Sequence, residues 1–390
     1  MHDVPANHSA CPTVEISNQA ALLSSTGSSR IIIAGGGTGG HLMPALAIAN
    51  AIREARPELE PVLVGATRGV EGEILPSRPF RFHLLPFEPI YRRKWWKNVR
   101  WPFIAWHLLR QIQTLLDKEK PVLVIGTGGY ASGPVVWLAA RRGIPTAIQE
   151  QNAFPGMATR RLSKRVRHVY LGLPEARSRL TFGKGTQVFD TGNPIVPPKS
   201  ELRESAREKF GIDSRDRVVL VTGGSQGALA INQVVAGWID HGLPDRTVLL
   251  WATGRGSYEQ FASYHRPPAV QVFDFLDPMA EGMAAADLVV ARAGAITLAE
   301  ICAWGLPSIL SPLPTAAADH QTFNARALAE SGAAIFLPQS DMTADSLEKA
   351  VLSLVSNDAQ RQTMRERALA RGKPRAAAEI VEHLCALLDT

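Results

Sequence analysis

RIIIAGGGTGGHLMPALAIANAI, residues 30–52, is the stretch that decides the fold of this chain. Its apolar start, residues 31–34, is too apolar for an exposed strand and too short for a helix, so we expect a buried parallel strand. The five glycines that follow allow positive φ angles and a close approach of backbone N–H groups to a ligand. Apolar residues then recur at helical spacing: Leu42, Ala45, Leu46, Ala49 and Ile52. The stretch therefore predicts a strand, a glycine loop and an α-helix.

The glycine loop and the helix start together form a candidate anion site. The N-terminus of an α-helix carries partial positive charge and free N–H groups, which attract phosphate. His41 lies at this terminus, beside any ligand that the loop holds. The same glycines also permit close packing of helix on sheet, so the loop alone does not separate a ligand site from a packing device.

The loop also fits the fingerprint of dinucleotide-binding folds, through Gly35, Gly37 and Gly40. That fingerprint requires an acidic residue at the end of the next strand, where it holds the ribose hydroxyls. The next expected strand ends in Gly65-Ala66-Thr67 instead. The sequence therefore argues against a nicotinamide or flavin enzyme.

The composition predicts a globular protein with more than one domain. A length of 390 residues suggests two or three domains, and a hydrophobic fraction of 45% is ample for their cores. Cys11, Cys302 and Cys385 are scattered and lack metal-ligand spacing, which favours a reducing compartment. The net charge of +6 favours anionic partners.

Several features are expected to be absent. Residues 1–28 lack the basic start and apolar core of a secretion signal, so we expect a flexible tail. No apolar run approaches the roughly 18 residues that a spanning helix needs. No Asp-x-Asp triplet occurs, and we expect neither a metal site nor a cofactor.

A second stretch, RVVLVTGGSQGALAINQVVAGWI at residues 217–239, repeats the opening design. It again places an apolar run before a glycine loop and an amphipathic helix. Two such stretches at equivalent points of the two halves predict two similar nucleotide-binding-type domains. Between them, IVPPKSELRESAREKFG, with paired prolines and a charged helical pattern, is typical of a linker.

The fold class that follows is α/β, with two Rossmann-like domains that face each other across a cleft. We expect a first domain at residues 29–195, completed by a C-terminal helix at about 376–390, and a second at 196–375. Strands are expected at residues 31–34, 61–65, 82–86, 122–126, 146–149 and 168–171, then at the start of the second stretch and at 247–251, 270–273, 288–291, 307–310 and 333–336.

A further glycine turn, GTGGYASGP at residues 126–134, follows the fourth expected strand. In an open α/β sheet the loops at the carboxyl ends of the strands line the ligand crevice. We therefore expect this turn to face the same cleft as His41.

Residues 86–112 interleave aromatic and basic side chains. Such a pattern favours the headgroup level of an anionic membrane, on which the segment would lie without crossing it. Core packing with a solvated basic rim and binding of single-stranded nucleic acid are the alternatives. The absence of a known RNA module argues against nucleic acid. The expected docking residues are Arg92, Arg93, Lys94, Trp95, Trp96, Lys97, Arg100 and Trp101.

Seven segments occur in the order GGGTGGHLMPALAIA, GTGGYASGP, QEQNAFPG, TGNPI, GGSQGALAIN, RAGAITLAEI and DHQTFNA. Together they resemble the motifs of the MurG family of bacterial glycosyltransferases, over about residues 30–385. The resemblance implies the GT-B fold and an inverting transfer of N-acetylglucosamine from UDP to the C4 hydroxyl of undecaprenyl-pyrophosphoryl-MurNAc-pentapeptide. That reaction turns lipid I into lipid II in peptidoglycan synthesis, on which cell shape and division depend.

The resemblance also implies where each partner binds. The second domain would hold UDP-GlcNAc, and the first would receive the lipid-linked acceptor at the cytoplasmic face of the inner membrane, as a peripheral protein beside other cell-wall synthesis proteins. Ser225 would meet the pyrophosphate, Leu276 the uracil through its backbone, and Glu300 the ribose hydroxyls. The implied donor contacts are Thr38, Gly39, Gly40, Asn152, Ser225, Leu276, Ala295, Ile296, Thr297, Leu298, Ala299, Glu300 and Gln321.

The chemistry of an inverting displacement requires a base that takes the proton of the acceptor hydroxyl. Histidine is the side chain whose pKa lies nearest to neutral pH, so His41 is the expected catalytic residue. Binding of the acceptor's pyrophosphate is its alternative role. Helix N-termini and backbone N–H groups can stabilise the departing UDP without a metal.

The chain departs from the family's pattern at two positions. Val196 follows TGNPI where the family often has arginine, and Arg292 is a nearby basic candidate that would equally brace its own turn. Gln149 stands where the family usually has histidine before EQN. Two other functions stay open: a UDP-sugar epimerase of the same fold, and a noncatalytic scaffold for cell-wall enzymes.

Overall fold

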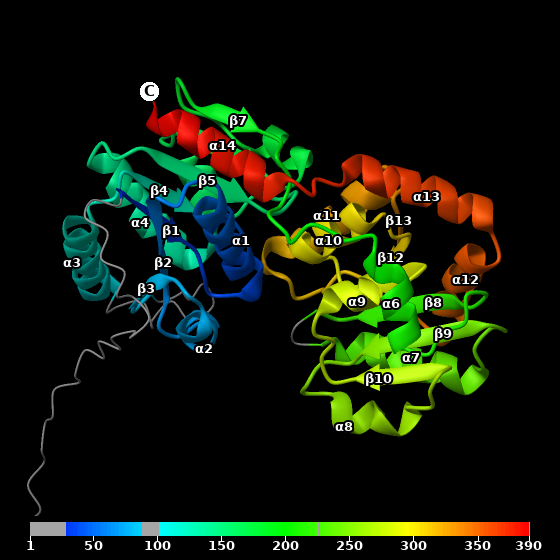
Figure 1. Ribbon diagram of the computed structural model, residues 1–390. Coiled ribbons are helices and arrows are strands. Elements are labelled where there is room, and N and C mark those ends of the chain that lie inside the picture. The colour runs from blue at the N-terminus through cyan, green and yellow to red at the C-terminus, as the bar shows by residue number, and fades with distance from the viewer. Residues whose placement is uncertain (1–28, 88–100, 225–226, 390) are drawn as a thin grey trace, which may run out of the picture.

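The computed structural model describes residues 29–87, 101–224 and 227–389, with the backbone alone at residues 101 and 102 (Figure 1). The expected tail lies outside this part of the chain, as do Ser225, the docking residues from Arg92 to Arg100 and the side chain of Trp101. Two parallel sheets form the two halves of the described molecule. Residues 190–201 and 372–375 connect them.

The first sheet has seven parallel strands in the order β3-β2-β1-β4-β5-β6-β7. The six strands expected in this half are confirmed, and a three-residue edge strand, too short to show a pattern, is added as β7. The bounds are β1 (Ser29–Ala34), β2 (Leu59–Ala66), β3 (Arg81–Leu85), β4 (Leu123–Gly126), β5 (Thr146–Glu150), β6 (His168–Leu171) and β7 (Gln187–Phe189).

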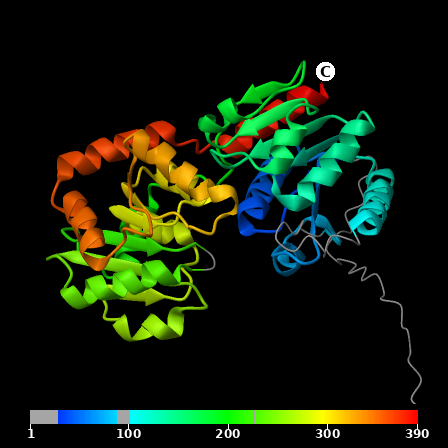
Figure 2. The ribbon, with the colours of Figure 1, turned by 180° about the vertical axis from the view of Figure 1, so that it is seen from behind.

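Helices cover both faces of the first sheet, which explains why its central strands are apolar throughout. One face packs against α1 (Gly39–Ala55) and α14 (Ala376–Leu388), so the end of the chain returns to the first half (Figure 1). The other packs against α3 (Trp101–Glu119) and α4 (Gly129–Arg141), which Figure 2 shows from behind. Shorter helices are α2 (Glu71–Ile74), α5 (Met157–Leu162) and the 3-10 segments at Leu75–Ser77 and Pro174–Arg179.

The second sheet has six parallel strands in the order β10-β9-β8-β11-β12-β13, and every strand expected in this half is confirmed. The bounds are β8 (Arg217–Thr222), β9 (Thr247–Ala252), β10 (Val270–Phe273), β11 (Leu288–Ala291), β12 (Ser308–Leu310) and β13 (Ala334–Phe336).

The second sheet is also covered on both faces. One face packs against α6 (Leu202–Lys209), α9 (Met279–Ala285), α10 (Ala295–Trp304) and α11 (His320–Glu330). The other packs against α7 (Leu229–His241) and α12 (Ala344–Val355). The remaining elements are α8 (Tyr258–Phe261), α13 (Asp358–Arg371) and the 3-10 segments at Ala262–Tyr264 and Ala317–Asp319.

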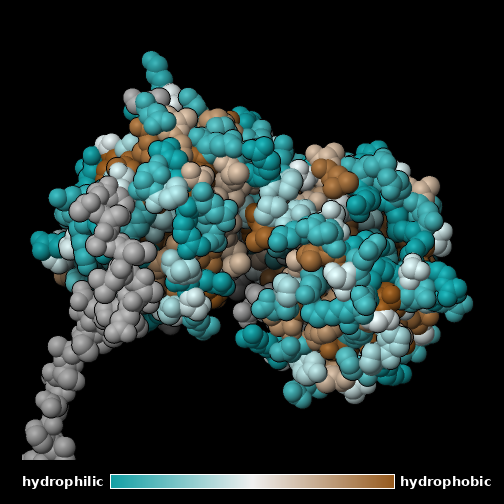
Figure 3. Space-filling view, in the orientation of Figure 1, coloured by the Kyte–Doolittle hydropathy of each residue, from teal (hydrophilic) through white to brown (hydrophobic). Residues whose placement is uncertain are grey.

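Each sheet reverses its strand order beside its first strand, because β1 lies between β2 and β4 and β8 lies between β9 and β11. Ligands of open α/β sheets bind outside the carboxyl ends of the strands at such a reversal. The glycine loops after β1 and β8 occupy these two positions. Helix α1 contacts α10 across the boundary, and the surface is hollowed between the two halves (Figure 3).

Candidate active site

His41 lies in the first turn of α1. Its Nδ1 atom is 3.1 Å from Oε1 of Gln151. The ring packs against the turn of residues 126–134, since a Cβ at Gly128 would lie 2.7 Å from Nδ1 and one at Gly129 would lie 3.1 Å from Cδ2. Both glycines have positive φ angles. The expectation that this turn faces the same cleft as His41 is confirmed.

The electrostatic surroundings keep His41 neutral. Burial lowers the pKa of His41, while the nearby Glu150 carboxylate opposes this shift. Glu150 is itself buried and accepts N–H groups from Asn152 and Gly156, each at 3.0 Å. A neutral imidazole at neutral pH is the form that can take a proton.

A second histidine, which the sequence analysis did not identify, lies across the boundary. His320 begins α11, and its charge contributes to the lowered pKa of His41. It follows two residues in the left-handed region, Ala318 and Asp319, with φ of 52° and 56°. Such backbone is costly for residues other than glycine and is concentrated at functional sites. In the sequence, only the presence of His320 within the segment DHQTFNA could have pointed to this residue.

Asn152 connects the halves. Its Nδ2 donates to Glu150 Oε1 at 3.3 Å, and its Oδ1 accepts from Asn324 of α11 at 3.1 Å. The neighbouring Ala153 N–H donates to Asn324 Oδ1 at 2.9 Å. The asparagine that the resemblance assigns to the donor sugar thus lies where the first half meets α11.

The first glycine loop rests on a buried carboxyl group. Gly37, at φ 95°, donates its N–H to Oε1 of Glu71, whose side chain is fully buried. Thr38 is extended and exposed, and α1 begins at Gly39. A Cβ at Gly39 would meet no atom within 4 Å, so open space lies beside this residue. Nothing in the sequence around Glu71 marks it as the support of the loop.

The second glycine loop is described at Gly223, Gly224 and Gly227 only. Gly224 has φ 81° and open space beside it, whereas a Cβ at Gly223 or Gly227 would collide with backbone. Leu276 is buried at 5% exposure, and its side chain packs against Gly282. The side chain of Leu276 is therefore not available for contact with a uracil ring.

Helix α10 supplies the run of expected donor contacts from Ala295 to Glu300. Burial raises the pKa of Glu300 to about 7. The side chain of Leu298 is 1% exposed and belongs to the core, while Ile296, Thr297 and Ala299 are half-buried. Gln321 accepts from the N–H of Leu313 at 2.9 Å, which fixes the loop before α11.

The two positions at which the chain departs from the family's pattern differ in their surroundings. Val196, where the family often has arginine, is 76% exposed. Arg292 braces its own region, because its guanidinium donates to the carbonyls of Ser311 and Pro312 at 3.0 and 2.9 Å. Gln149 is fully buried and donates to Asn193 at 2.9 Å.

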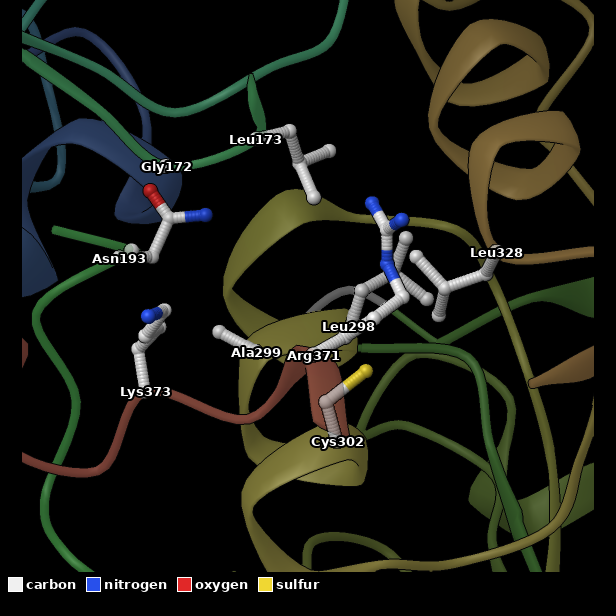
Figure 4. Close-up of a pocket in the computed structure, with 10 residues that line it drawn as sticks. Gly172, Leu173, Asn193, Leu298, Ala299, Cys302, Leu328, Arg371 and Lys373 are labelled. Atoms are coloured by element: carbon white, nitrogen blue, oxygen red, sulfur yellow. The ribbon is translucent and has the colours of Figure 1, made fainter. Parts of the chain in front are cut away.

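A small pocket lies where the halves are joined (Figure 4). Leu173 and Asn193 from the first half face Leu298 and Cys302 of α10, with Arg371 from the end of α13 beside them. Arg371 forms an ion pair with Glu175 at 2.7 Å. Its position makes this pocket part of the joint between the halves. Among the described residues, no group of three or more His, Cys, Asp or Glu side chains could hold a metal.

From residue 101 onward, the basic aromatic segment belongs to α3. Leu108 and Ile112 pack into the core, whereas Phe103 and Trp106 are 81% and 56% exposed. Arg110 stacks over the Trp106 ring at 4.0 Å from its centroid. In the described ranges no helix combines the length and apolarity that crossing a bilayer requires.

Comparison with known proteins shows relatives over most of the chain. Residues 31–171 match the glycosyltransferase family 28 N-terminal domain, and residues 218–380 match the glycosyltransferase family 28 C-terminal domain. The UDP-N-acetylglucosamine--N-acetylmuramyl-(pentapeptide) pyrophosphoryl-undecaprenol N-acetylglucosamine transferase of Carboxydothermus hydrogenoformans is 40% identical over 349 residues, 87% of this chain and 92% of the relative.

Two solved structures have the same overall fold as this chain but differ in sequence identity to it. The crystal structure of Acinetobacter baumannii MurG has a TM-score of 0.73 at 27% identity, covering 92% of this chain and 99% of that one. A putative UDP-N-acetylglucosamine 2-epimerase from Listeria monocytogenes has a TM-score of 0.64 at 15% identity, covering 93% and 97%. At that lower identity the likeness concerns the fold only.

Proposed function

Because the chain belongs to the MurG family of glycosyltransferases, we propose that it transfers N-acetylglucosamine from UDP-N-acetylglucosamine to undecaprenyl-pyrophosphoryl-MurNAc-pentapeptide. The product is lipid II, and the new bond forms at the C4 hydroxyl with inversion of the anomeric centre. The observation that carries the proposal is the convergence of His41 from the first half and α10 and His320 from the second on one boundary.

The two halves divide the substrates. The donor binds to the second domain, residues 196–375, where Gly224 and the open space beside it follow β8. Glu300 of α10 accepts the ribose hydroxyls, whose donation favours its charged form. The acceptor binds to the first domain, residues 29–195 with 376–390, beside the start of α1. Thr38, Gly39 and Asn152 meet the transferred sugar between them.

His41 acts as the base. The acceptor hydroxyl attacks the anomeric carbon while UDP leaves from the opposite side, and His41 takes the hydroxyl proton. Negative charge develops on the departing pyrophosphate, where loop N–H groups and a helix N-terminus stabilise it. Because the folded-state pKa of His41 is lowered, protonation abolishes this role only on the acid side of the ordinary histidine range.

Docking on a membrane surface brings the protein to its lipid-linked acceptor. The exposed Phe103 and Trp106 with Arg110 extend the basic aromatic pattern along α3. Aromatic side chains and cations of this kind favour an anionic headgroup layer. We place the protein, as a peripheral protein, at the cytoplasmic face of the inner membrane.

A transfer assay with labelled UDP-N-acetylglucosamine and a soluble acceptor analogue tests this function. Wild type should form the β-1,4 disaccharide, and His41→Ala should lose about 10²- to 10⁴-fold in kcat, the usual range for a general base. With acceptor in vesicles, turnover should rise with the fraction of anionic lipid.

Three results would contradict the function or the base. Conversion of the donor without acceptor would indicate an epimerase, and failure to bind the donor would indicate a scaffold. Normal turnover of His41→Ala would remove His41 as the base and leave the function intact.

A further inference from the structure

Behind His41 lies a row of buried amide side chains that the reaction as described does not use. Gln149, Gln151 and Asn193 are 0%, 2% and 2% exposed. His41 Nδ1 contacts Gln151 Oε1 at 3.1 Å, Gln151 Nε2 donates to Gln149 Oε1, and Gln149 Nε2 donates to Asn193 Oδ1 at 2.9 Å. Side-chain amides in a core are costly unless all their groups are paired, so this row is a built feature.

Backbone carbonyls fix the direction of every bond in the row. Gln151 Nε2 also faces the carbonyl of Thr127 at 2.5 Å. Asn193 Nδ2 faces the carbonyls of Gln151 and Ala295, at 3.1 and 3.3 Å. A carbonyl can only accept, so at both ends the NH₂ group must point to it and neither amide can be flipped. Oε1 of Gln151 is therefore the atom that faces His41.

The consequence for His41 concerns its proton. Gln151 Oε1 has no hydrogen, so Nδ1 of the neutral imidazole must carry one and donate it. We propose that Gln151 is a positioning residue that holds His41 as the Nδ1–H tautomer, with Gln149 and Asn193 holding Gln151. Nε2 then keeps its lone pair and is the atom that accepts the proton from the acceptor hydroxyl. This assignment rests on the proposed function, in which His41 is the base.

The row also crosses between the two halves. Its last member, Asn193, donates to the carbonyl of Ala295, the first residue of α10. The helix proposed to run along the nucleotide therefore shares a hydrogen-bonded network with the imidazole of the other half. A shift of α10 away from the first half would remove one of the two carbonyls that orient Asn193, and through it Gln149 and Gln151.

NMR of the full chain labelled with ¹⁵N-histidine tests the tautomer directly. Long-range ¹H–¹⁵N correlations distinguish Nδ1–H from Nε2–H imidazole, and the His41→Ala spectrum identifies the His41 signals among the ten histidines. Wild type should show the Nδ1–H form. Gln151→Leu should shift His41 toward Nε2–H. An Nε2–H form in wild type, or an unchanged tautomer in Gln151→Leu, would overturn the assignment.

Kinetics separate positioning from simple loss of structure. Gln151→Leu should lower kcat by about 10- to 100-fold, the usual cost of losing a residue that orients a ligating or reacting histidine. The KM for donor should stay within about twofold, because Gln151 is proposed to act on proton transfer and not on donor binding. The hydrogen bond to Gln151 raises the pKa of His41, so its loss should move the acid limb of the kcat profile to lower pH. The other groups that act on this pKa, Glu150, the Thr127 carbonyl and His320, stay in place. An unchanged kcat would overturn the positioning role.

A matched control is available in the other half. Gln271 is also buried, and its amide donates to the carbonyl of Phe210 at 2.7 Å. Gln271→Leu should destabilise the fold as Gln151→Leu does but leave the His41 tautomer and the pH profile unchanged. If Gln151→Leu fails to fold, the wild-type spectrum still decides the assignment, because an Nε2–H form of His41 would contradict it. A tautomer shift in Gln271→Leu would also contradict the proposal.

Discussion

The two glycine loops share a sequence design but differ in what lies beneath them. After β1, the N–H of Gly37 is already bonded to the fully buried Glu71, and Gly65 packs on the same side chain, where a Cβ would lie 2.6 Å from Glu71 Cγ. After β8, Gly224 donates to its neighbour Thr222 at 3.3 Å, and at the described glycines of this loop no carboxyl group accepts an N–H.

This difference assigns unequal roles to two loops that the sequence presents as equal. A carboxyl oxygen at an N–H group occupies the place that a phosphate oxygen would take. The first loop is thus partly filled by the protein's own acceptor and presents its open side at Gly39. The second keeps open space beside Gly224, where we propose that the pyrophosphate of the donor binds. The comparison supports binding of the donor by the second half.

The largest expected effect is the loss of stability when the Glu71 carboxyl group beneath the first loop is removed. Glu71→Ala leaves a cavity and an unpaired Gly37 N–H, so we expect the free energy of unfolding to fall by roughly 2–4 kcal/mol. Urea unfolding followed by circular dichroism measures it. Glu71→Gln, which keeps an acceptor oxygen of the same reach, is the control and should lose much less. Equal stability of Glu71→Ala and wild type would mean that the first loop does not depend on Glu71.

A smaller effect is expected for the second half, where donor binding should depend on pH through Glu300. Burial raises the pKa of Glu300 to about 7, so the folded protein binds a proton more tightly than the unfolded chain does. If the ribose hydroxyls need the carboxylate, the affinity for UDP-N-acetylglucosamine should fall by up to about tenfold for each pH unit below 7. The same shift means that the contribution of Glu300 to stability is greatest at acid pH and declines as pH rises toward 7.

Titration calorimetry of UDP-N-acetylglucosamine, whose phosphates do not titrate in this range, between pH 5.5 and about 8 measures this dependence. Glu300→Gln carries no titrating group at this position and should bind the donor more weakly but with a flat profile between pH 6 and about 8. His41→Ala serves as the matched variant from the first half and should keep the wild-type slope. A flat wild-type profile would remove Glu300 from the donor site.

The sequence predicted the elements that depend on local pattern. The runs around Ile32 and Leu220 are apolar because both faces of their strands are covered, and each loop needs glycines where its backbone turns. The approach of His41 to the turn at Gly128 followed from sheet topology.

Other parts of the site depend on packing between distant segments, which no local pattern encodes. Gln149 and Asn193 are 44 residues apart, and His41 and Gln151 are 110 apart. Single amides at such separations do not show which groups they meet. Glu71 could not be identified from the sequence either, because an acidic residue in a short helix is usually exposed.

The smallest effect compares one glycine from each loop. Gly39 lies in helical backbone with open space, so alanine fits there without strain and should raise the free energy of unfolding by about 0.4–1 kcal/mol. Gly224 also has open space, but its φ of 81° disfavours any side chain, so Gly224→Ala should lower stability by roughly 1 kcal/mol.

If the space beside Gly39 is for substrate, Gly39→Ala gains stability and loses turnover together, since the new methyl group occupies that space. Urea unfolding and the transfer assay on the same samples measure both quantities. A more stable Gly39→Ala with full activity would show that the open side of the first loop is not used by the substrate, and the two loops would then differ in function as well as in support.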